Sequence, residues 1–354
     1  MGVAAGRFSA AQLREKPEFD AALAALIEAI ERFAGILETQ AGRAEGLEKC
    51  WQRAGELLER LRRWQQPDGS GFVYWGEAFT HALQLNATPL DVAEIFRKQM
   101  GGHPRAWIFT SATLAVQGRF QHYCSEMGLG EPESACWQSP FDYGRQAVLY
   151  APLGMPEPND WRFTEAVVEA AWPAVQAAQG GTFFLCTSLR AMRRTRELLQ
   201  EKIDAAGLDV PLLVQGEGSK NDLLQRFRFH GAAILVGSQS FWEGVDVRGE
   251  ALSLVVIDKI PFAPPDDPVL SARIDELKKQ GRNAFIEYQL PRAVISVKQG
   301  AGRLIRDESD RGVLMICDPR MLSKPYGRKV WQSLPPMQRT KELRTVLEFF
   351  AAPR

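Results

Sequence analysis

The stretch that decides the fold is Ser253-Leu254-Val255-Val256-Ile257-Asp258, an apolar run that ends in a carboxylate. Its apolar residues do not alternate with polar ones, which is typical of a strand buried on both faces of a sheet. Similar runs predict further strands at 147–151, 182–187, 211–215, 232–237 and 312–317. Helical patterns lie between most of them, at 163–178, 189–206, 219–229, 267–280 and 289–299. The alternation predicts an α/β fold in which helices flank both faces of a parallel sheet.

The N-terminal part has a different pattern. Apolar residues recur every three or four positions over 18–38 and 47–64, and the short segment between them favours a hairpin of two antiparallel helices. The Gly- and Pro-containing segment 65–71 indicates a module boundary. Beyond it we expect strands at 72–75 and 83–85, a helix over 90–99 with Pro89 in its N-terminal turn, and a buried strand at 106–110.

Composition is that of an ordinary globular protein: 354 residues, 45% hydrophobic and 24% charged, with 43 basic and 43 acidic residues. Nucleic-acid binding would therefore use local basic patches. No apolar run approaches a membrane span and no signal-peptide pattern is present, so we expect a cytoplasmic protein without membrane contact. The five cysteines, without any C-x-x-C pair, are interpreted as buried or incidental thiols, and we expect no metal site in this chain.

Small hydroxyl residues, acidic residues and arginines gather in four stretches that follow expected strands in order along the chain: 110–113, 187–190, 240–246 and 299–306. Loops of this kind are where α/β sheets contact ligands. In the last stretch Arg303 and Arg306 are three residues apart, so on a helix they would offer two guanidinium groups from one face to a shared anion. The alternative for that spacing is a solvated helix face.

In this order and spacing the four stretches resemble motifs III, IV, V and VI of superfamily 2 helicases. Segments 240–268, 298–318 and 325–336 resemble the YoaA/DinG-type branch of the XPD-like iron–sulfur DNA helicases in particular. The resemblance runs from about residue 72 to near the C-terminus. It implies a RecA-like motor domain 2 over 126–354, the C-terminal part of motor domain 1 over 72–125, and a helical remnant of the arch insertion over 1–71.

The sequence contains no G-x-x-x-x-G-K-[ST] loop, no D-E-A-H-type box before Ser111, and none of the family's four cluster-binding cysteines. By resemblance, the chain is the C-terminal half of an ATP-dependent 5′-to-3′ DNA helicase acting in DNA repair or replication. ATP and Mg²⁺ would occupy a site shared with the missing N-terminal half, which would also hold the iron–sulfur cluster. We expect this chain alone to be inactive as an ATP hydrolase.

The resemblance to motif VI implies that Arg303 and Arg306 are arginine fingers, which stabilise the charge that develops on the γ-phosphate. It also implies that Gln299 is a polar sensor of the nucleotide. Nucleotide-contacting positions would be Gly244, Asp246 and Gly302. For Asp246 a turn or helix-capping role is the alternative.

The resemblance also implies contacts to single-stranded DNA. Its phosphates would be held by Thr187, Ser188, Arg190 and Arg193, supported by Arg194, while Trp242 offers a stacking surface. Ser111 and Thr113 would couple the nucleotide state to strand binding. The alternatives are a solvated face for the arginines, core packing for Trp242 and local capping for the two hydroxyls.

A second class of function is a non-catalytic interaction module. The C-terminal tail is basic at Arg339, Lys341 and Arg344 and then carries Leu347, Phe349 and Phe350. Such an amphipathic end could dock on a repair protein or on a chi-like accessory subunit of DNA polymerase III. The alternative, which we favour, is a helix that packs back on the sheet.

Overall fold

The computed structural model describes residues 6–353 except 68, 70, 80, 103–104, 179–180, 239–240 and 242–250. The chain divides into two compact units. Unit 1 comprises Met1–Ala106, Ser125–Leu129 and Ala263–Phe285, and unit 2 comprises Trp107–Cys124, Gly130–Phe262 and Ile286–Arg354. Two elements have residues in both units, α5 (Gln121–Met127) and the π-helical turn η3 (Phe285–Gln289). The domain boundaries predicted at residues 71 and 125 stay predictions.

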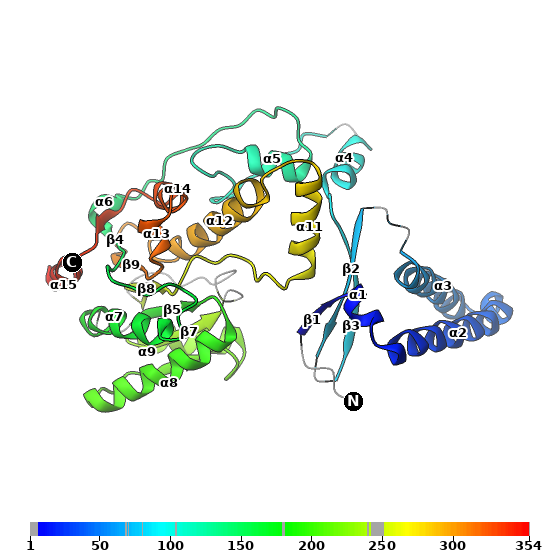
Figure 1. Ribbon diagram of the computed structural model, residues 1–354, viewed down its shortest axis with the longest axis horizontal. Helices are drawn as coiled ribbons and strands as arrows, with labels where there is room; N and C mark the ends of the chain where they lie inside the picture. The colour runs from blue at the N-terminus through cyan, green and yellow to red at the C-terminus, as the bar shows by residue number, and fades with distance from the viewer. Residues whose placement is uncertain are drawn as a thin grey trace. The chain divides into compact units, whose positions relative to one another are not determined.

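Unit 1 combines a helical hairpin with an antiparallel sheet (Figure 1). The hairpin consists of α2 (Pro17–Gln40), η1 (Ala41–Arg43) and α3 (Glu45–Gln65). The sheet has the order β1 (Gly6–Ser9), β2 (Phe72–Ala78) and β3 (Leu83–Pro89). The other helices are α1 (Ala10–Arg14), α4 (Ala93–Gly101) and α11 (Pro268–Lys279).

The hairpin forms as its apolar spacing predicted. Leu23, Ile27 and Leu37 of α2 are buried together with Leu58 of α3 in a shared core. Trp64, near the end of α3, is only 3% exposed, and its indole N–H donates to the carbonyl of Asn86 in β3 at 3.2 Å. The hairpin therefore packs on the sheet of the same unit.

Two predictions in this region are wrong. Pro89 is the last residue of β3 and does not open the following helix, which begins at Ala93. Residues 106–110 form no strand, and Ile108 is 83% exposed. The helix predicted at 267–280 is present as α11, and it belongs to unit 1.

Unit 2 is built on a seven-stranded, wholly parallel sheet with the order β10-β4-β9-β8-β5-β7-β6 (Figure 1). Its strands are β4 (Ala147–Tyr150), β5 (Thr182–Cys186), β6 (Leu212–Val214), β7 (Ile234–Ser238), β8 (Leu254–Ile257), β9 (Gly312–Ile316) and β10 (Gln338–Thr340). Its helices are α6 (Tyr143–Gln146), α7 (Phe163–Ala177), α8 (Leu189–Ala206), α9 (Lys220–His230), α12 (Leu290–Ala301), α13 (Arg320–Ser323), α14 (Gly327–Ser333) and α15 (Leu343–Ala351). The predicted α/β fold is confirmed.

Both faces of the sheet are covered. On one face Phe184, Val256 and Met315 pack in one cluster with residues of α7, α8 and α15. On the other face Phe183 of β5 contacts Phe227 of α9, with ring centroids 4.8 Å apart, and α12 packs against β8. Every residue of β4, β5, β8 and β9 is buried, which is why these strands read as continuous apolar runs in the sequence.

The start of β9 is fixed by the close packing of Leu304 and the Ser253 carbonyl against Gly312. A side chain added at Gly312 would place its Cβ 2.5 Å from a methyl carbon of Leu304 and 2.6 Å from the carbonyl oxygen of Ser253. The absence of a side chain at Gly312 leaves room for Leu304, which is 1% exposed. Leu304 lies between the two arginines of interest, so this contact anchors their turn to the sheet.

Candidate functional site

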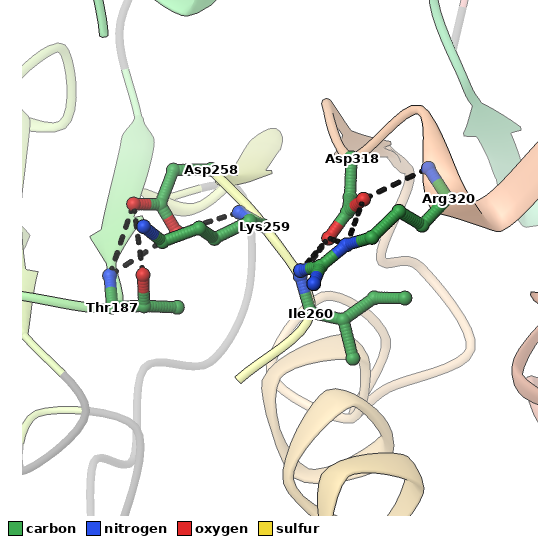
Figure 2. A network of polar contacts seen from close by, with 6 residues as sticks. All are labelled: Thr187, Asp258, Lys259, Ile260, Asp318 and Arg320. Atoms are coloured by element: carbon green, nitrogen blue, oxygen red, sulfur yellow. Dashed lines mark hydrogen bonds and ion pairs between the residues drawn. The ribbon is translucent and has the colours of Figure 1, made fainter. Parts of the chain in front are cut away.

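Polar groups follow three adjacent strands at the carboxyl edge of the sheet: Thr187 after β5, Asp258 after β8 and Asp318 after β9. Figure 2 shows the contacts among them. The strands are parallel, so their carboxyl ends share one edge, where such sheets bind ligands. Of the predicted site residues, Thr187 belongs to this network; Asp258, Asp318 and Arg320 were not singled out from the sequence.

Asp258 joins the loops after β5 and β8. Its carboxylate accepts from the backbone N–H of Thr187, with both oxygens 3.1 Å away, and from the Thr187 hydroxyl at 3.2 Å. It also accepts from the backbone N–H of Lys259 at 2.6 Å (Figure 2). Burial raises the pKa of Asp258 to about 6, although the Thr187 and Lys259 groups act in the opposite direction. The carboxyl group therefore holds a proton more readily than an ordinary aspartate does.

Two thiols lie at the carboxyl ends of the two strands that flank β8. Cys186 and Cys317 are fully buried, and burial, reinforced by the charge of Asp258, raises the pKa of both thiols well above its ordinary value. A thiol held in its neutral form is a poor nucleophile and a poor metal ligand. These cysteines are therefore packing residues.

Asp318 fixes the neighbouring loop. It accepts from the backbone N–H of Ile260 at 2.8 Å and binds the Arg320 guanidinium through both oxygens, with the shortest contact at 2.6 Å. Figure 2 places this cluster next to the Asp258 cluster, with Lys259 and Ile260 between them. Two buried carboxylates thus hold the backbone from Asp258 to Ile260 in one conformation.

The first turn of α8 carries the predicted phosphate contacts. Ser188 caps the helix by accepting from the Ala191 N–H at 3.1 Å, so its hydroxyl has a local structural role. Arg190 and Arg193 are exposed, whereas Arg194 pairs with Glu165 at 2.9 Å and with Glu197 at 3.0 Å. Cations are unfavourable beside the positive end of a helix, so an anion bound there would stabilise Arg190 and Arg193.

The arginine pair lies elsewhere in the fold. The prediction that Arg303 and Arg306 share a helix face is wrong, because α12 ends at Ala301, with Gly302 as its C-cap. The chain turns there and buries Leu304 and Ile305, which are 1% and 2% exposed. This turn precedes β9, so it lies at the amino edge of the sheet, opposite Thr187.

Hydrogen bonds fix the arginine turn. The buried Asp310 carboxylate accepts from the backbone N–H groups of Arg306 at 2.7 Å and of Asp307 at 2.9 Å. Gln146, which precedes β4, donates to the carbonyls of Asp307, Glu308 and Asp310 at 3.0 Å each. Arg303 and Arg306 are both half-buried. Two guanidinium groups are thus carried on a backbone that the sheet holds rigidly.

The segment with the predicted coupling residues contacts the same helix. Ser111 and Thr113 form a local turn, with their hydroxyl oxygens 3.3 Å apart and the Thr113 N–H donating to Ser111 Oγ. Lys298 Nζ, next to the half-buried Gln299 on α12, donates to the carbonyl of Ala115 at 2.8 Å. Burial lowers the pKa of Lys298. The contact ties the hydroxyl turn to the helix that leads to the arginines.

Trp242, Gly244 and Asp246 lie outside the described residues, and their predicted roles stay predictions. Within the described part of the chain, no three His, Cys, Asp or Glu side chains gather as a metal site. The cysteines described there are separate free thiols and do not fit a four-thiolate iron–sulfur cluster. No helix among the described residues is both long enough and apolar enough to cross a membrane.

A parallel sheet covered on both faces, with Arg303 and Arg306 at its amino edge and the start of α8 at its carboxyl edge, has a RecA-like fold. Residues 171–337 match the helicase C-terminal domain family. The chain is 42% identical over 342 residues to the ATP-dependent DNA helicase YoaA of Escherichia coli K12, covering 97% of this chain and 53% of the relative. It is 36% identical over 284 residues to the helicase DinG of Mycobacterium tuberculosis, covering 77% and 41%.

Among solved structures, an XPD helicase aligns with a TM-score of 0.59 at 16% identity, covering 87% of this chain and 55% of the other. That likeness supports the fold. Residues 171–337 therefore belong to the helicase C-terminal domain family, and the chain, which is similar to YoaA and DinG helicases, spans about half the length of the curated YoaA relatives it matches.

We expect Asp258→Asn to remove one component of the pH dependence of stability. The folded carboxyl has a pKa of about 6 and the ordinary value is 3.8, so between pH 4 and 6 the folded state binds more protons than the unfolded state. The free energy of unfolding contributed by Asp258 then falls as pH rises through this window and is constant above it. Urea unfolding at pH 5 and pH 7 measures the effect.

The difference in unfolding free energy between the unmodified chain and Asp258→Asn should fall by about 1 kcal/mol from pH 5 to pH 7. Because the two proteins share all other titrating groups, the contributions of those groups to the unfolding free energy cancel in this difference. An equal difference at both pH values would mean that Asp258 is already ionised at pH 5.

Proposed function

We propose that this chain supplies the second motor domain of an ATP-dependent 5′-to-3′ DNA helicase that acts in DNA repair or replication. The observation that carries the proposal is the separation of two sets of basic and hydroxyl residues by one sheet. Arg303 and Arg306 lie at the amino edge, and Thr187, Arg190 and Arg193 lie at the carboxyl edge. This arrangement suits a domain that senses a nucleotide at one edge and holds a DNA strand at the other.

At the nucleotide, Arg303 and Arg306 would stabilise the charge that spreads over the γ-phosphate oxygens during phosphoryl transfer. The rigid turn supports this role, because a guanidinium group that is already in position needs little reorganisation as charge develops. Gln299 and Gly302 lie at the same end of α12, and Gly244 and Asp246 are proposed to complete this side of the site. ATP, Mg²⁺ and the iron–sulfur cluster would be held by the N-terminal half found in full-length relatives.

At the other edge, Arg190 and Arg193 of α8 would bind the phosphates of single-stranded DNA, and Thr187 would position the start of that helix. Asp258 supports this role, because it holds the Thr187 N–H and hydroxyl and thereby fixes the start of α8. Such contacts position a strand without reading its sequence. Ser111 and Thr113, tied to α12 through Ala115, would couple the two edges. A cytoplasmic location is part of the proposal.

The arginine fingers can be tested in a chimera that joins this chain to the N-terminal half of the Escherichia coli relative. We expect DNA-stimulated ATP hydrolysis, with kcat reduced about 10³-fold in Arg303→Ala and in Arg306→Ala, because a transition-state arginine contributes at least that factor. Steady-state phosphate release measures kcat. The chain alone should show no activity above its own double-alanine variant.

The matched control for the chimera is Arg344→Ala, which removes an exposed arginine from α15 and should leave kcat unchanged. An active chimera whose kcat is insensitive to both finger variants would refute the assignment. ATP hydrolysis by the isolated chain, above the Arg303→Ala/Arg306→Ala double variant, would refute the proposal that the catalytic half lies elsewhere.

The DNA contacts can be tested by fluorescence anisotropy of a labelled oligonucleotide at several salt concentrations. Replacing both Arg190 and Arg193 by alanine should weaken binding and reduce the slope of log K against log salt by about 1.4, since each single-strand phosphate contact contributes about 0.7. Arg226→Ala serves as the control, since Arg226 is an exposed arginine on α9, outside the Thr187 loop and α8. An unchanged slope in the double variant would contradict phosphate binding by these arginines.

A second candidate function is docking of a protein partner, such as a chi-like accessory subunit of DNA polymerase III, at the C-terminal tail. The apolar side of α15 is already occupied, because Val346 is fully buried and Phe349 and Phe350 pack against the core. The supporting feature is a groove of about 430 Å³ beside the edge strand β10. It is lined by Trp331, Arg339, Thr340, Lys341, Glu342 and Thr345.

Lys341→Glu should abolish capture of a purified chi-like subunit if this groove is the docking surface, because the exposed charge is reversed without disturbing the core. Pull-down with the purified subunit measures capture. Arg226→Glu is the matched control, since it makes the same charge change on α9, next to the opposite edge strand. Equal capture by both variants would contradict docking at β10.

A further inference from the structure

Trp161 is unusually exposed for a tryptophan. It lies in the loop between β4 and α7, and the residue is 81% exposed, although tryptophan side chains commonly bury most of their large apolar surface. The neighbouring Phe163, two residues later, is only 4% exposed and belongs to the core cluster of the sheet. The indole therefore projects from a backbone that is anchored two residues away from it.

The turn that carries Trp161 is braced on both sides. Asp160 accepts from the Arg162 backbone N–H at 2.9 Å and from its guanidinium at 2.9 and 3.2 Å. The Arg162 guanidinium lies 5.8 Å from the centroid of the Trp161 ring. An exposed aromatic ring with a fixed cation over one face leaves its remaining surface open to a planar group attached to a phosphate.

The position of this turn in the fold connects it to the proposed DNA edge. The loop follows β4, so it leaves the sheet at the same carboxyl edge as Thr187 and Asp258. Lys259, whose backbone N–H binds Asp258, places its ammonium 5.9 Å from the ring centroid of Phe163. β4 and β5 are three interstrand spacings apart, about 14 Å, which a few nucleotides of a single strand can span.

We propose that Trp161 is a stacking platform for an unpaired base of single-stranded DNA. The inference deepens the proposed function, since it rests on a strand bound along the carboxyl edge with its phosphates at Arg190 and Arg193. Stacking is tolerant of sequence because every base has a π-face, so it suits a motor that moves along any strand. Arg162 and Lys259 supply positive charge for the phosphates on either side of the stacked base.

The test is the affinity of the chain for a fluorescein-labelled oligothymidylate. Trp161→Ala should weaken binding about 5- to 100-fold, and Trp161→Phe should keep most of the affinity, because an aromatic ring is retained. Phe229→Ala is the matched control. Phe229 is 87% exposed at the end of α9, immediately before β7, and therefore lies at the opposite edge of the sheet, so its loss should not change binding.

A second oligonucleotide separates stacking from a structural role. When every base is replaced by an abasic residue, the unmodified chain should bind as weakly as Trp161→Ala, and the variant should lose little further affinity. Unchanged affinity of Trp161→Ala, while the Arg190→Ala/Arg193→Ala variant weakens, would overturn the stacking role and leave the proposed function standing. No binding of either oligonucleotide by the unmodified chain would overturn both.

Discussion

Burial of both faces of the seven-stranded sheet is the constraint on which unit 2 depends. A strand covered on both sides has no surface for a polar side chain, so chemistry can be placed only where strands begin or end. Asp258, Asp310 and Asp318 are all at such positions, and each is at most 4% exposed. Buried carboxylates are costly unless they are hydrogen-bonded, and here each accepts from backbone N–H groups that would otherwise lack partners. The carboxylates thereby fix the loops that carry the site.

The strand β9 joins the two edges. Gly312 at its start receives Leu304 from the arginine turn, and Asp318 just beyond its end holds Arg320 and the backbone of Ile260. A strand of five residues spans about 15 Å and is stiff when paired on both sides, as β9 is with β4 and β8. The strand β9 thus connects the arginine turn at one edge with Asp318 at the other.

Much of this fold could be predicted from the sequence. Strands buried on both faces are continuous apolar runs, so six of the seven strands in the sheet were located to within two residues. The seventh, β10, consists of Gln338, Arg339 and Thr340 and has no apolar pattern, because it is an edge strand.

The run at 106–110 has the composition of a strand but pairs with no other strand, and the local sequence pattern cannot show whether a pairing partner exists. Local spacing also failed for Arg303 and Arg306. The helix that was expected to carry them ends before Arg303, because Leu304 and Ile305 turn into the core. Asp258 and Asp318 could have been found by asking which polar residue first follows each apolar run.

The cysteines offer a consequence of a different kind. Cys186 and Cys317 are buried with raised pKa values, so they are protected from alkylation, and Cys124 is only partly accessible. The exposed thiols are Cys50 on α3 in unit 1 and Cys136 in unit 2. A maleimide dye would therefore react fastest at one position in each unit. The unsubstituted chain thus carries a pair of natural attachment points for measuring, by energy transfer in solution, the distance between its two units.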